Sequence, residues 1–268
     1  MIFVTGDCHG DFGRFSTKEF PRQKELTKDD LVIILGDAAF VWEGSKEEKW
    51  WLDWFESKPF TTINIGGNHE NYDLLEQYPK IRWHGGEAYQ LRASVLHLCR
   101  GYTFDLNGLK TFVMGGAQSH DADKILQPGP DLARQRQRLE WLHIPYRVLG
   151  QTWWPQELPS QEEFITARNT LDREGWSVDL VLSHCAPTEL QSQIVRNYPA
   201  NDLTEFFQVL LGHLSYGQWF CGHYHRSEQF PEHRFRVLGE EIISLQHPEK
   251  SVSPQPEAVF SDKEGAAQ

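Results

Sequence analysis

Long hydrophobic runs are missing from this sequence of 268 residues. No stretch approaches the roughly 18–20 consecutive apolar residues that span a membrane, and the mean hydropathy is −0.55. The first residues also lack the basic and apolar segments of a secretory signal. We therefore expect a cytoplasmic protein without a membrane partner.

Cysteine is scarce as well. The four cysteines are Cys8, Cys99, Cys185 and Cys221, and no two of them form a Cys-x-x-Cys pair. Thiols stay reduced in the cytoplasm, so the even number does not predict disulfides. We expect Cys8, Cys185 and Cys221 to be small buried packing residues.

The sequence has fewer basic than acidic residues. The chain has 26 Lys and Arg residues against 38 Asp and Glu residues, which gives a formal net charge of −12. Proteins that bind nucleic acid along its length gain affinity by neutralising phosphates and usually show a basic surface. The composition therefore argues against extended DNA or RNA as a partner, but it allows a short nucleotide in a metal-lined pocket.

Short apolar runs recur along the chain and predict an α/β fold. Runs that end in Gly or polar residues predict buried strands at 2–5, 31–35, 61–65, 179–182 and 218–221. Helical periodicity lies between them at 46–57, 160–175 and 202–213, with Asp202 as the expected N-cap of the last helix. Further strand-like segments lie at 90–98, 102–106, 110–114, 235–238 and 242–245. The Asn107-Gly108 pair predicts a hairpin, so we expect sheets of mixed direction.

We expect one domain over residues 1–246. Residues 118–159 interrupt its pattern with a Pro-Gly-Pro turn, an arginine-rich helical run and a Trp153-Trp154-Pro155 segment. Long insertions in compact domains often form lids or binding loops, so a cap or lid is predicted here. The composition of residues 247–268 predicts a flexible tail.

Polar side chains collect where five of the predicted strands end. In an open α/β sheet, ligands bind in the crevice at the carboxyl ends of the strands. The residues at these ends are Asp7, His9, Asp37, Asn68, His69, His184, His223 and His225.

Carboxylate, amide and imidazole donors without a thiolate suit Mn²⁺, Fe²⁺ or Zn²⁺. Seven ligands from this set of eight residues are too many for one tetrahedral ion, whereas two ions that share a bridging carboxylate would use them well. Two divalent ions with two carboxylates and a hydroxide leave about one positive charge. The site would therefore attract a phosphate anion even in an acidic protein.

The order of these motifs resembles that of the calcineurin-like metallophosphoesterases, from about residue 2 to residue 225. The matching motifs are Asp7-x-His9, Gly36-Asp37, Gly67-Asn68-His69-Glu70, His184 and Gly222-His223-x-His225. The resemblance implies an αββα sandwich of two mixed β-sheets flanked by helices, with a dinuclear metal centre at the strand ends. It implies that one ion is held by Asp7, His9 and His225, and the other by Asn68, His184 and His223. Asp37 would bridge the two ions, and His69 would be the acid near the leaving group.

One departure narrows the expected substrate. Protein phosphatases of this superfamily carry Gly-Asp-x-x-Asp-Arg-Gly at the second motif, whereas this chain has Phe40 and Val41 in place of the second Asp and the Arg. That absence argues against a protein phosphatase and leaves His69 without an obvious carboxylate partner. The Gly222-His223-x-His225 ending instead resembles the phosphodiesterase and nuclease branches of the superfamily. We therefore expect a phosphodiesterase that acts on a small phosphodiester or nucleotide through a metal-bridging hydroxide. Manganese is the favoured metal, with Fe²⁺, Zn²⁺ or Mg²⁺ as alternatives.

Two alternatives remain open: a phosphomonoesterase of the same fold, and a non-catalytic metal-binding scaffold. The sequence assigns no substrate-binding residue, but the insertion offers candidates. Ser119-His120-Asp121 is either a loop at the edge of the metal site or simply a connection. The arginines of the insertion could include a phosphate clamp or form a solvated helix face; they are Arg134, Arg136, Arg138 and Arg147. Trp153 and Trp154 could stack a base, although pinning of the insertion is the favoured interpretation.

Overall fold

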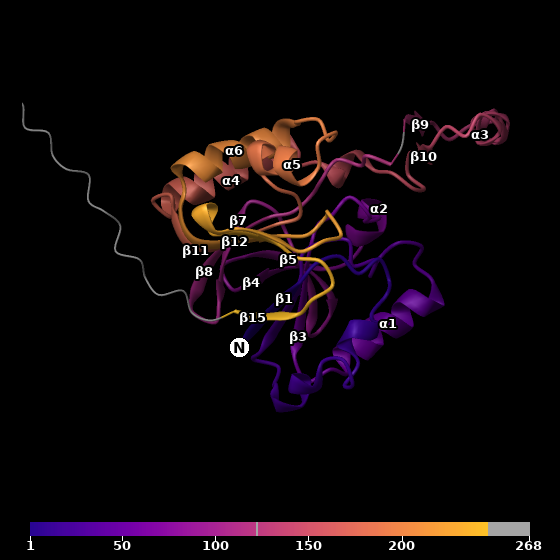
Figure 1. The fold of residues 1–268 in the computed structure, drawn as a ribbon. Helices are drawn as coiled ribbons and strands as arrows, with labels where there is room; N and C mark the ends of the chain where they lie inside the picture. Colours follow the sequence, from indigo (N-terminus) through magenta and orange to yellow (C-terminus); the bar gives the residue numbers. More distant parts are fainter. Residues whose placement is uncertain (122, 246–268) are drawn as a thin grey trace, which may run out of the picture.

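Two β-sheets pack face to face between layers of helices in the computed structural model, which describes residues 1–121 and 123–245 (Figure 1). The first sheet has seven strands in the order β15-β1-β2-β3-β6-β5-β4. Their bounds are Ile243–Leu245, Ile2–Thr5, Leu31–Ile34, Thr61–Ile65, Val95–Leu98, Gly86–Arg92 and Lys80–Trp83. The four central strands β1, β2, β3 and β6 run parallel, and the outer three are antiparallel to their neighbours.

The second sheet has six strands in the order β13-β14-β12-β11-β8-β7. Their bounds are Glu228–Phe230, Phe235–Val237, Ser215–Cys221, Ser177–Ser183, Leu109–Met114 and Tyr102–Leu106. The inner four are parallel, and β13 and β7 are antiparallel to their neighbours. The mixed direction predicted from the sequence is therefore confirmed in both sheets.

Three hydrophobic clusters correspond to the three interfaces between four layers. Side chains such as Ile33, Ile63 and Leu182 fill the space between the two sheets. Helix α1 (Lys46–Glu56) buries Leu52 and Phe55 on the outer face of the first sheet. Helices α4 (Gln161–Arg173), α5 (Thr188–Ile194) and α6 (Asp202–His213) cover the outer face of the second sheet. This αββα arrangement confirms the predicted fold class.

Two predicted local features were wrong. Residues 90–98 do not form one strand, because β5 and β6 are an antiparallel pair that reverses between Arg92 and Val95. The N-cap of α6 is Asn201 rather than Asp202, since the Asn201 side chain accepts hydrogen bonds from the backbone N–H groups of Leu203 and Thr204.

The Asn107-Gly108 hairpin is confirmed. It joins β7 to β8 with positive φ angles of 51° and 85°, which are the values that a type I′ turn requires at both central residues.

The insertion at 118–159 contains strands β9 (Lys124–Leu126) and β10 (Tyr146–Val148), which pair in parallel, and helix α3 (Leu132–Trp141). Figure 1 shows that these elements project from the rest of the molecule. Helix α3 buries none of its residues. The insertion returns to the body through a short 3₁₀ turn at Pro155–Glu157.

The short helix α2 (Tyr72–Leu75) follows β3, and further 3₁₀ turns lie at Gly13–Phe15, Pro21–Glu25 and Pro231–His233. The predicted tail at 247–268 lies outside the described residues. Within the part of the chain that the structure describes, no helix is long and apolar enough to cross a membrane.

Candidate metal centre

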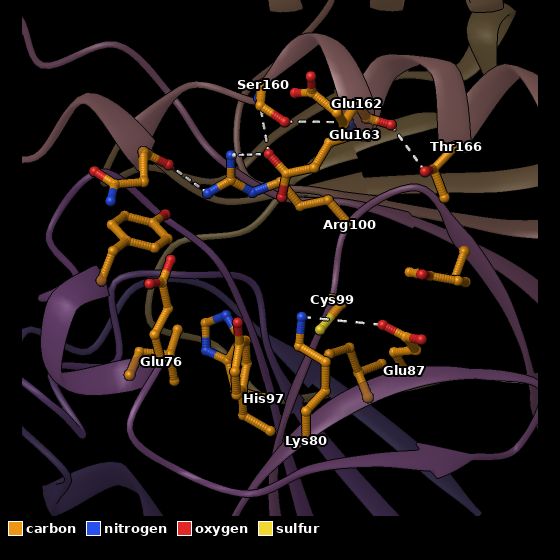
Figure 2. A pocket seen from close by; sticks show the side chains of 16 residues that line it. Glu76, Lys80, Glu87, His97, Cys99, Arg100, Ser160, Glu162, Glu163 and Thr166 are labelled. Atoms are coloured by element: carbon orange, nitrogen blue, oxygen red, sulfur yellow. Dashed lines mark hydrogen bonds and ion pairs between the residues drawn. The ribbon is translucent and has the colours of Figure 1, made fainter.

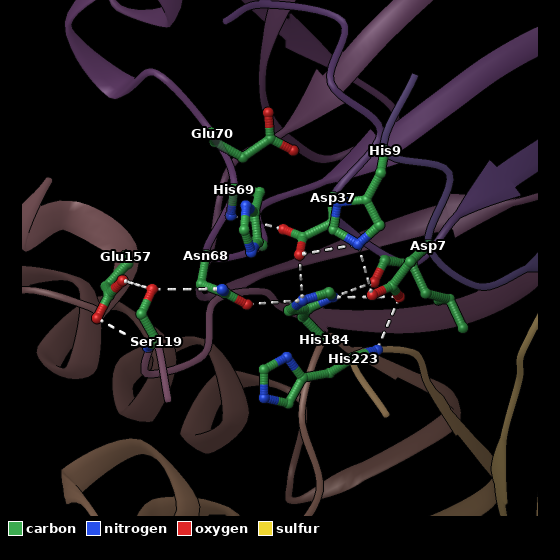
Figure 3. Close-up of polar contacts among 12 residues, drawn as sticks. Asp7, His9, Asp37, Asn68, His69, Glu70, Ser119, Glu157, His184 and His223 are labelled. Atoms are coloured by element: carbon green, nitrogen blue, oxygen red, sulfur yellow. Dashed lines mark hydrogen bonds and ion pairs between the residues drawn. The ribbon is translucent and has the colours of Figure 1, made fainter. Parts of the chain in front are cut away.

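The predicted site residues come from both sheets and meet at one edge of the sandwich. Asp7 and His9 follow β1, Asp37 follows β2, and Asn68 and His69 follow β3. From the second sheet, His184 follows β11, and His223 and His225 follow β12. Most of these side chains point toward one another in Figure 3, so the sheet edges bring together residues that lie far apart in the sequence.

One cluster is open to solvent. Asp7 Oδ2 lies 3.6 Å from His9 Nε2 and 3.8 Å from His225 Nε2. The two imidazole rings stack with 5.0 Å between their centroids. The side chain of His225 is 63% exposed, whereas that of Asp7 is 3% exposed. The three donors are close enough to hold one ion at the mouth of the site.

The second cluster is buried. His184 Nε2 lies 3.4 Å from Asp37 Oδ2 and 3.3 Å from Asn68 Oδ1. The other ring nitrogen, Nδ1, lies 2.5 Å from the carbonyl oxygen of Leu35, which leaves Nε2 directed into the cluster. The ring of His223 lies 5.0 Å from that of His184.

Asp37 lies between the two clusters. Its Oδ2 is 3.4 Å from His184 Nε2 and 3.8 Å from His9 Nε2, and its Oδ1 accepts a hydrogen bond of 2.7 Å from the backbone N–H of His69. A Cβ atom at Gly67 would stand 1.9 Å from Asp37 Oδ1. The glycine before Asn68 is therefore required for this close approach.

The electrostatics of the site favour a bound cation. Burial alone would lower the pKa of His184, but the carboxylates of Asp37 and Asp7 outweigh it and raise that pKa to about 9. Burial lowers the pKa of His223 to about 3, so its ring is neutral at pH 7 and can donate a lone pair. The buried atoms Asp7 Oδ2 and His223 Nε2 have no hydrogen-bond partner among the described residues. Both atoms can donate a lone pair to a divalent metal ion, which would satisfy them.

The insertion fixes the orientation of Asn68. The Asn68 Nδ2 group donates to Ser119 Oγ at 3.3 Å, and Ser119 Oγ donates to Glu157 Oε2 at 2.6 Å. The backbone N–H of Ser119 donates to Glu157 Oε1 at 3.0 Å. Because the amide nitrogen is held by this chain of bonds (Figure 3), the amide oxygen faces His184. The sequence identifies the Ser119 loop as a candidate edge of the metal site, whereas no sequence motif marks Glu157.

His69 lies beside the open cluster, with its ring edge-on to His9 at 4.9 Å between centroids. Burial lowers the pKa of His69, with a further contribution from the charge of Arg147. Arg147 Nη2 is 3.0 Å from His69 Nε2. Phe40 is buried in the aromatic core, stacked on Phe12 at 5.2 Å, so position 40 supplies no polar partner to His69.

Two other candidates from the insertion, His120 and Trp154, pack against side chains of the body. His120 stacks on Tyr198 with 3.6 Å between centroids, and its ring lies 5.9 Å from that of His223. Trp154 is buried, and its Nε1–H donates to Asp73 Oδ2 at 2.8 Å. This contact anchors the end of the insertion to α2, in agreement with the favoured interpretation of the tryptophan pair.

The cysteines next to the site are packing residues, as expected. Cys8, Cys185 and Cys221 are buried as free thiols. Burial raises the pKa of Cys8 and of Cys185 to about 12. None of the metal-capable clusters found among the described residues includes a cysteine.

A separate pocket of about 310 Å³ lies between β5, β6 and the start of α4 (Figure 2). Its buried Arg100 donates to the carbonyl oxygen of Gln156 at 2.5 Å and pairs with Glu163 at 3.5 Å. The guanidinium also lies over the ring of Tyr72, whose hydroxyl donates to the carbonyl oxygen of Gly67 at 2.6 Å. Tyr72, which packs against Arg100 in this pocket, thus holds the loop that carries Asn68.

A known protein family matches most of this chain. The family model of the calcineurin-like phosphoesterases matches residues 1–227. A segment of 105 residues is 30% identical to lariat debranching enzyme A of Xenopus laevis, covering 34% of this chain and 20% of that protein. The chain therefore matches only a fifth of that relative's length. Phosphopantetheinyl hydrolase of Mycobacterium tuberculosis aligns over 100% of this chain and 98% of its own at 17% identity, with a TM-score of 0.39. On the strength of the family match, the chain belongs to the calcineurin-like phosphoesterase family and is a metal-dependent phosphoester hydrolase.

Proposed function

We propose that the protein hydrolyses a small phosphodiester or nucleotide at two divalent metal ions. The observation that carries this proposal is the set of three overlapping metal-capable groups around Asp7 and Asp37, beside which the buried atoms Asp7 Oδ2 and His223 Nε2 have no hydrogen-bond partner among the described residues. The donors assigned to the first ion are Asp7, His9 and His225, and those assigned to the second are Asn68, His184 and His223. Asp37 contributes to both ions. Manganese is the proposed metal, because this mixed O/N donor set suits it.

The ions, when bound, supply a hydroxide nucleophile near neutral pH and neutralise negative charge on the phosphate. The side chains of the protein hold the ions and orient the groups around them. Asp7 and Asp37 hold the positive charge at the sheet edge, and Ser119 keeps the Asn68 oxygen turned inward. His69 lies beside the open cluster, where it would donate a proton to the leaving oxygen.

The Gly222-His223-x-His225 ending supports the preference for diesters, and the second motif argues against a phosphoprotein substrate. Phe40 and Val41 are buried apolar residues, so the Asp–Arg pair of the protein phosphatases has no counterpart at these positions. The net charge of −12 supports a small substrate rather than a nucleic-acid polymer. We place the reaction in the cytoplasm, which cell fractionation followed by detection of the protein would test.

A phosphomonoesterase is the second candidate, and Arg147 is the observation that favours it. This buried guanidinium lies beside His69, and a guanidinium binds phosphate oxygens well. A monoester offers three terminal phosphate oxygens and a diester offers two.

Hydrolysis of two chromogenic substrates separates these candidates. Metal-stripped protein is reloaded with Mn²⁺, Fe²⁺, Zn²⁺ or Mg²⁺ and assayed with bis-p-nitrophenyl phosphate and p-nitrophenyl phosphate. Metal-dependent cleavage that favours the diester is the expected result. A preference for the monoester would replace the first candidate by the second. Two bound ions without cleavage of either substrate would contradict both.

A further inference from the structure

Arg147 reaches the metal centre from the insertion. It belongs to β10 (Tyr146–Val148), on an element that projects from the body of the molecule. Its side chain is nevertheless only 8% exposed, and its Nη2 lies 3.0 Å from His69 Nε2. An arginine is rarely buried unless its charge is paired with an acidic group or binds a ligand.

Neighbours from the same insertion hold the guanidinium in one orientation. Arg147 Nε donates to Asp121 Oδ1 at 2.8 Å, and Nη2 donates to Asp121 Oδ2 at 2.5 Å. Nη1 donates to the carbonyl oxygen of Thr152 at 2.8 Å. A guanidinium has five N–H donors. These contacts use three of them and the contact of Nη2 with His69 uses a fourth, so one N–H remains free, on Nη1. The end of the group formed by the two Nη atoms lies at His69.

The other arginines of the insertion differ from Arg147. Arg134 and Arg138 are exposed on α3, which has no buried residue. Arg136 Nη2 donates to Gln151 Oε1 at 2.7 Å. Arg147 alone among these four is buried and contacts a predicted site residue.

We propose that Arg147 binds the phosphoryl group of the substrate and that Asp121 and Thr152 position it for this contact. The proposal rests on the proposed function, because the phosphate would lie between the donor clusters and His69. The free N–H of Nη1 and the N–H of Nη2 that faces His69 form the edge with which an arginine binds two oxygens of a phosphate, and the phosphate would replace the His69 nitrogen as the acceptor on Nη2. The insertion thus supplies the arginine that position 41, a valine, does not.

This contact also affects the choice of substrate. Because a monoester has one more terminal oxygen and more negative charge than a diester, an extra fixed cation gains more from the monoester. Arg147 therefore shifts the preference of the site toward terminal phosphates. Its loss lowers hydrolysis of p-nitrophenyl phosphate more than hydrolysis of bis-p-nitrophenyl phosphate.

The test compares four variants with the wild-type protein: Arg147→Ala, Arg147→Lys, Asp121→Asn and the matched control Arg136→Ala. Metal content is measured first. Binding of inorganic phosphate to the metal-loaded proteins is then measured by isothermal titration calorimetry, and kcat/KM is measured with both substrates. The phosphate titration reports on the contact without any turnover.

Arg147→Ala is expected to keep both ions and to weaken phosphate binding about tenfold or more, since one charge-assisted hydrogen bond is of that size. Arg147→Lys restores part of this loss, because lysine keeps the charge but not the planar fork. Asp121→Asn gives a smaller loss than Arg147→Ala. Arg136→Ala stays within about twofold of the wild type, as expected for an exposed polar contact.

The outcomes separate this inference from the proposed function. Unchanged phosphate binding in Arg147→Ala, with hydrolysis by the wild type intact, overturns the inference alone. Phosphate binding that depends on Arg147, in a protein that hydrolyses neither substrate, overturns the proposed function alone. Loss of metal from Arg147→Ala assigns the residue a structural role and overturns the inference. An equal loss on both substrates keeps the phosphate contact and overturns the effect on substrate choice.

Discussion

Replacing Ser119 by alanine should weaken the binding of one metal ion although Ser119 is not itself a proposed ligand. Its hydroxyl accepts from Asn68 Nδ2 and donates to Glu157 Oε2. The alanine variant removes the hydroxyl that donates to Oε2 of Glu157, a residue that is 3% exposed, and keeps the backbone N–H of residue 119 as a donor to Oε1. The Asn68 amide also loses the partner that fixes which of its two ends faces His184.

The size of the effect follows from the two hydrogen bonds that the substitution removes. Loss of a partner that orients a metal ligand costs about 10–100-fold in metal affinity, which corresponds to about 1.4–2.7 kcal/mol. The buried oxygen of Glu157 left without its hydroxyl adds about 1–3 kcal/mol to the loss of folding stability. Only the ion assigned to Asn68 should be affected, because the ligands Asp7, His9 and His225 make no contact with Ser119.

The assay is a calorimetric titration of metal-stripped protein with Mn²⁺, combined with urea unfolding. One of the two binding steps should move by about 10–100-fold in Ser119→Ala, and Ser119→Thr, which keeps a hydroxyl, should recover much of this loss. Ser192→Ala is the matched control, since that hydroxyl is exposed and bonds only within α5. Two unchanged binding steps in a folded Ser119→Ala protein would refute the positioning role.

The site and its surroundings lead to four further expectations. Asp37→Asn should lose at least one ion and its activity, as measured by metal analysis and phosphoester hydrolysis. Full activity with two ions bound would show that Asp37 is not a ligand of both ions. His69→Ala should keep both ions in metal analysis and lower kcat by about 10²–10⁴-fold, whereas loss of metal would show that His69 is not purely an acid. Saturating Mn²⁺ at about 100 times its Kd should stabilise the stripped protein by about 2.7 kcal/mol per site, measured by urea unfolding, and an unchanged midpoint would argue against metal binding by the folded state. Burial, with a contribution from Arg100, lowers the pKa of His97 to about 3, below its value in the unfolded chain. The stability present above about pH 6.5 is therefore lost as the pH falls toward 3. Between pH 7 and 5 the free energy of unfolding should fall by up to about 2 kcal/mol more in the wild type than in His97→Gln, and an equal fall in the two proteins would contradict this.

The local parts of the structure could be predicted from sequence because they depend on neighbouring residues. Asn107-Gly108 favours the positive φ angles of a tight hairpin wherever it occurs. The break inside residues 90–98 was missed because Ala93 and Ser94 carry no strong turn signal, and only the pairing of β5 with β6 reveals it. The N-cap of α6 was misplaced by one residue because Asn201 and Asp202 are both good capping residues.

The proposed ligands could be named from the sequence because each lies a few residues beyond a strand and because the order of their motifs resembles that of the calcineurin-like metallophosphoesterases. A strand that ends in Gly-Asp or Gly-Asn-His carries its donor to the sheet edge whatever the rest of the chain does. The groups that position these donors could not be identified in this way. Glu157 reaches Ser119 only through the return of the insertion, and nothing near Glu157 in the sequence marks it as a partner of Asn68.

Arg147 shows the same limit most clearly. In the sequence it is one of four arginines in the insertion, and the other three lie on a helix that buries nothing. Its contact with His69 exists because β10 pairs with β9 and Asp121 turns the guanidinium toward the site. Most of the strands, the donor types and their order can be predicted from the sequence, since these follow from local periodicity and residue chemistry. Which donors lie beside Asp37, and which arginine reaches His69, depends on the tertiary structure, because the packing of two sheets and an insertion sets the distances between residues far apart in the chain.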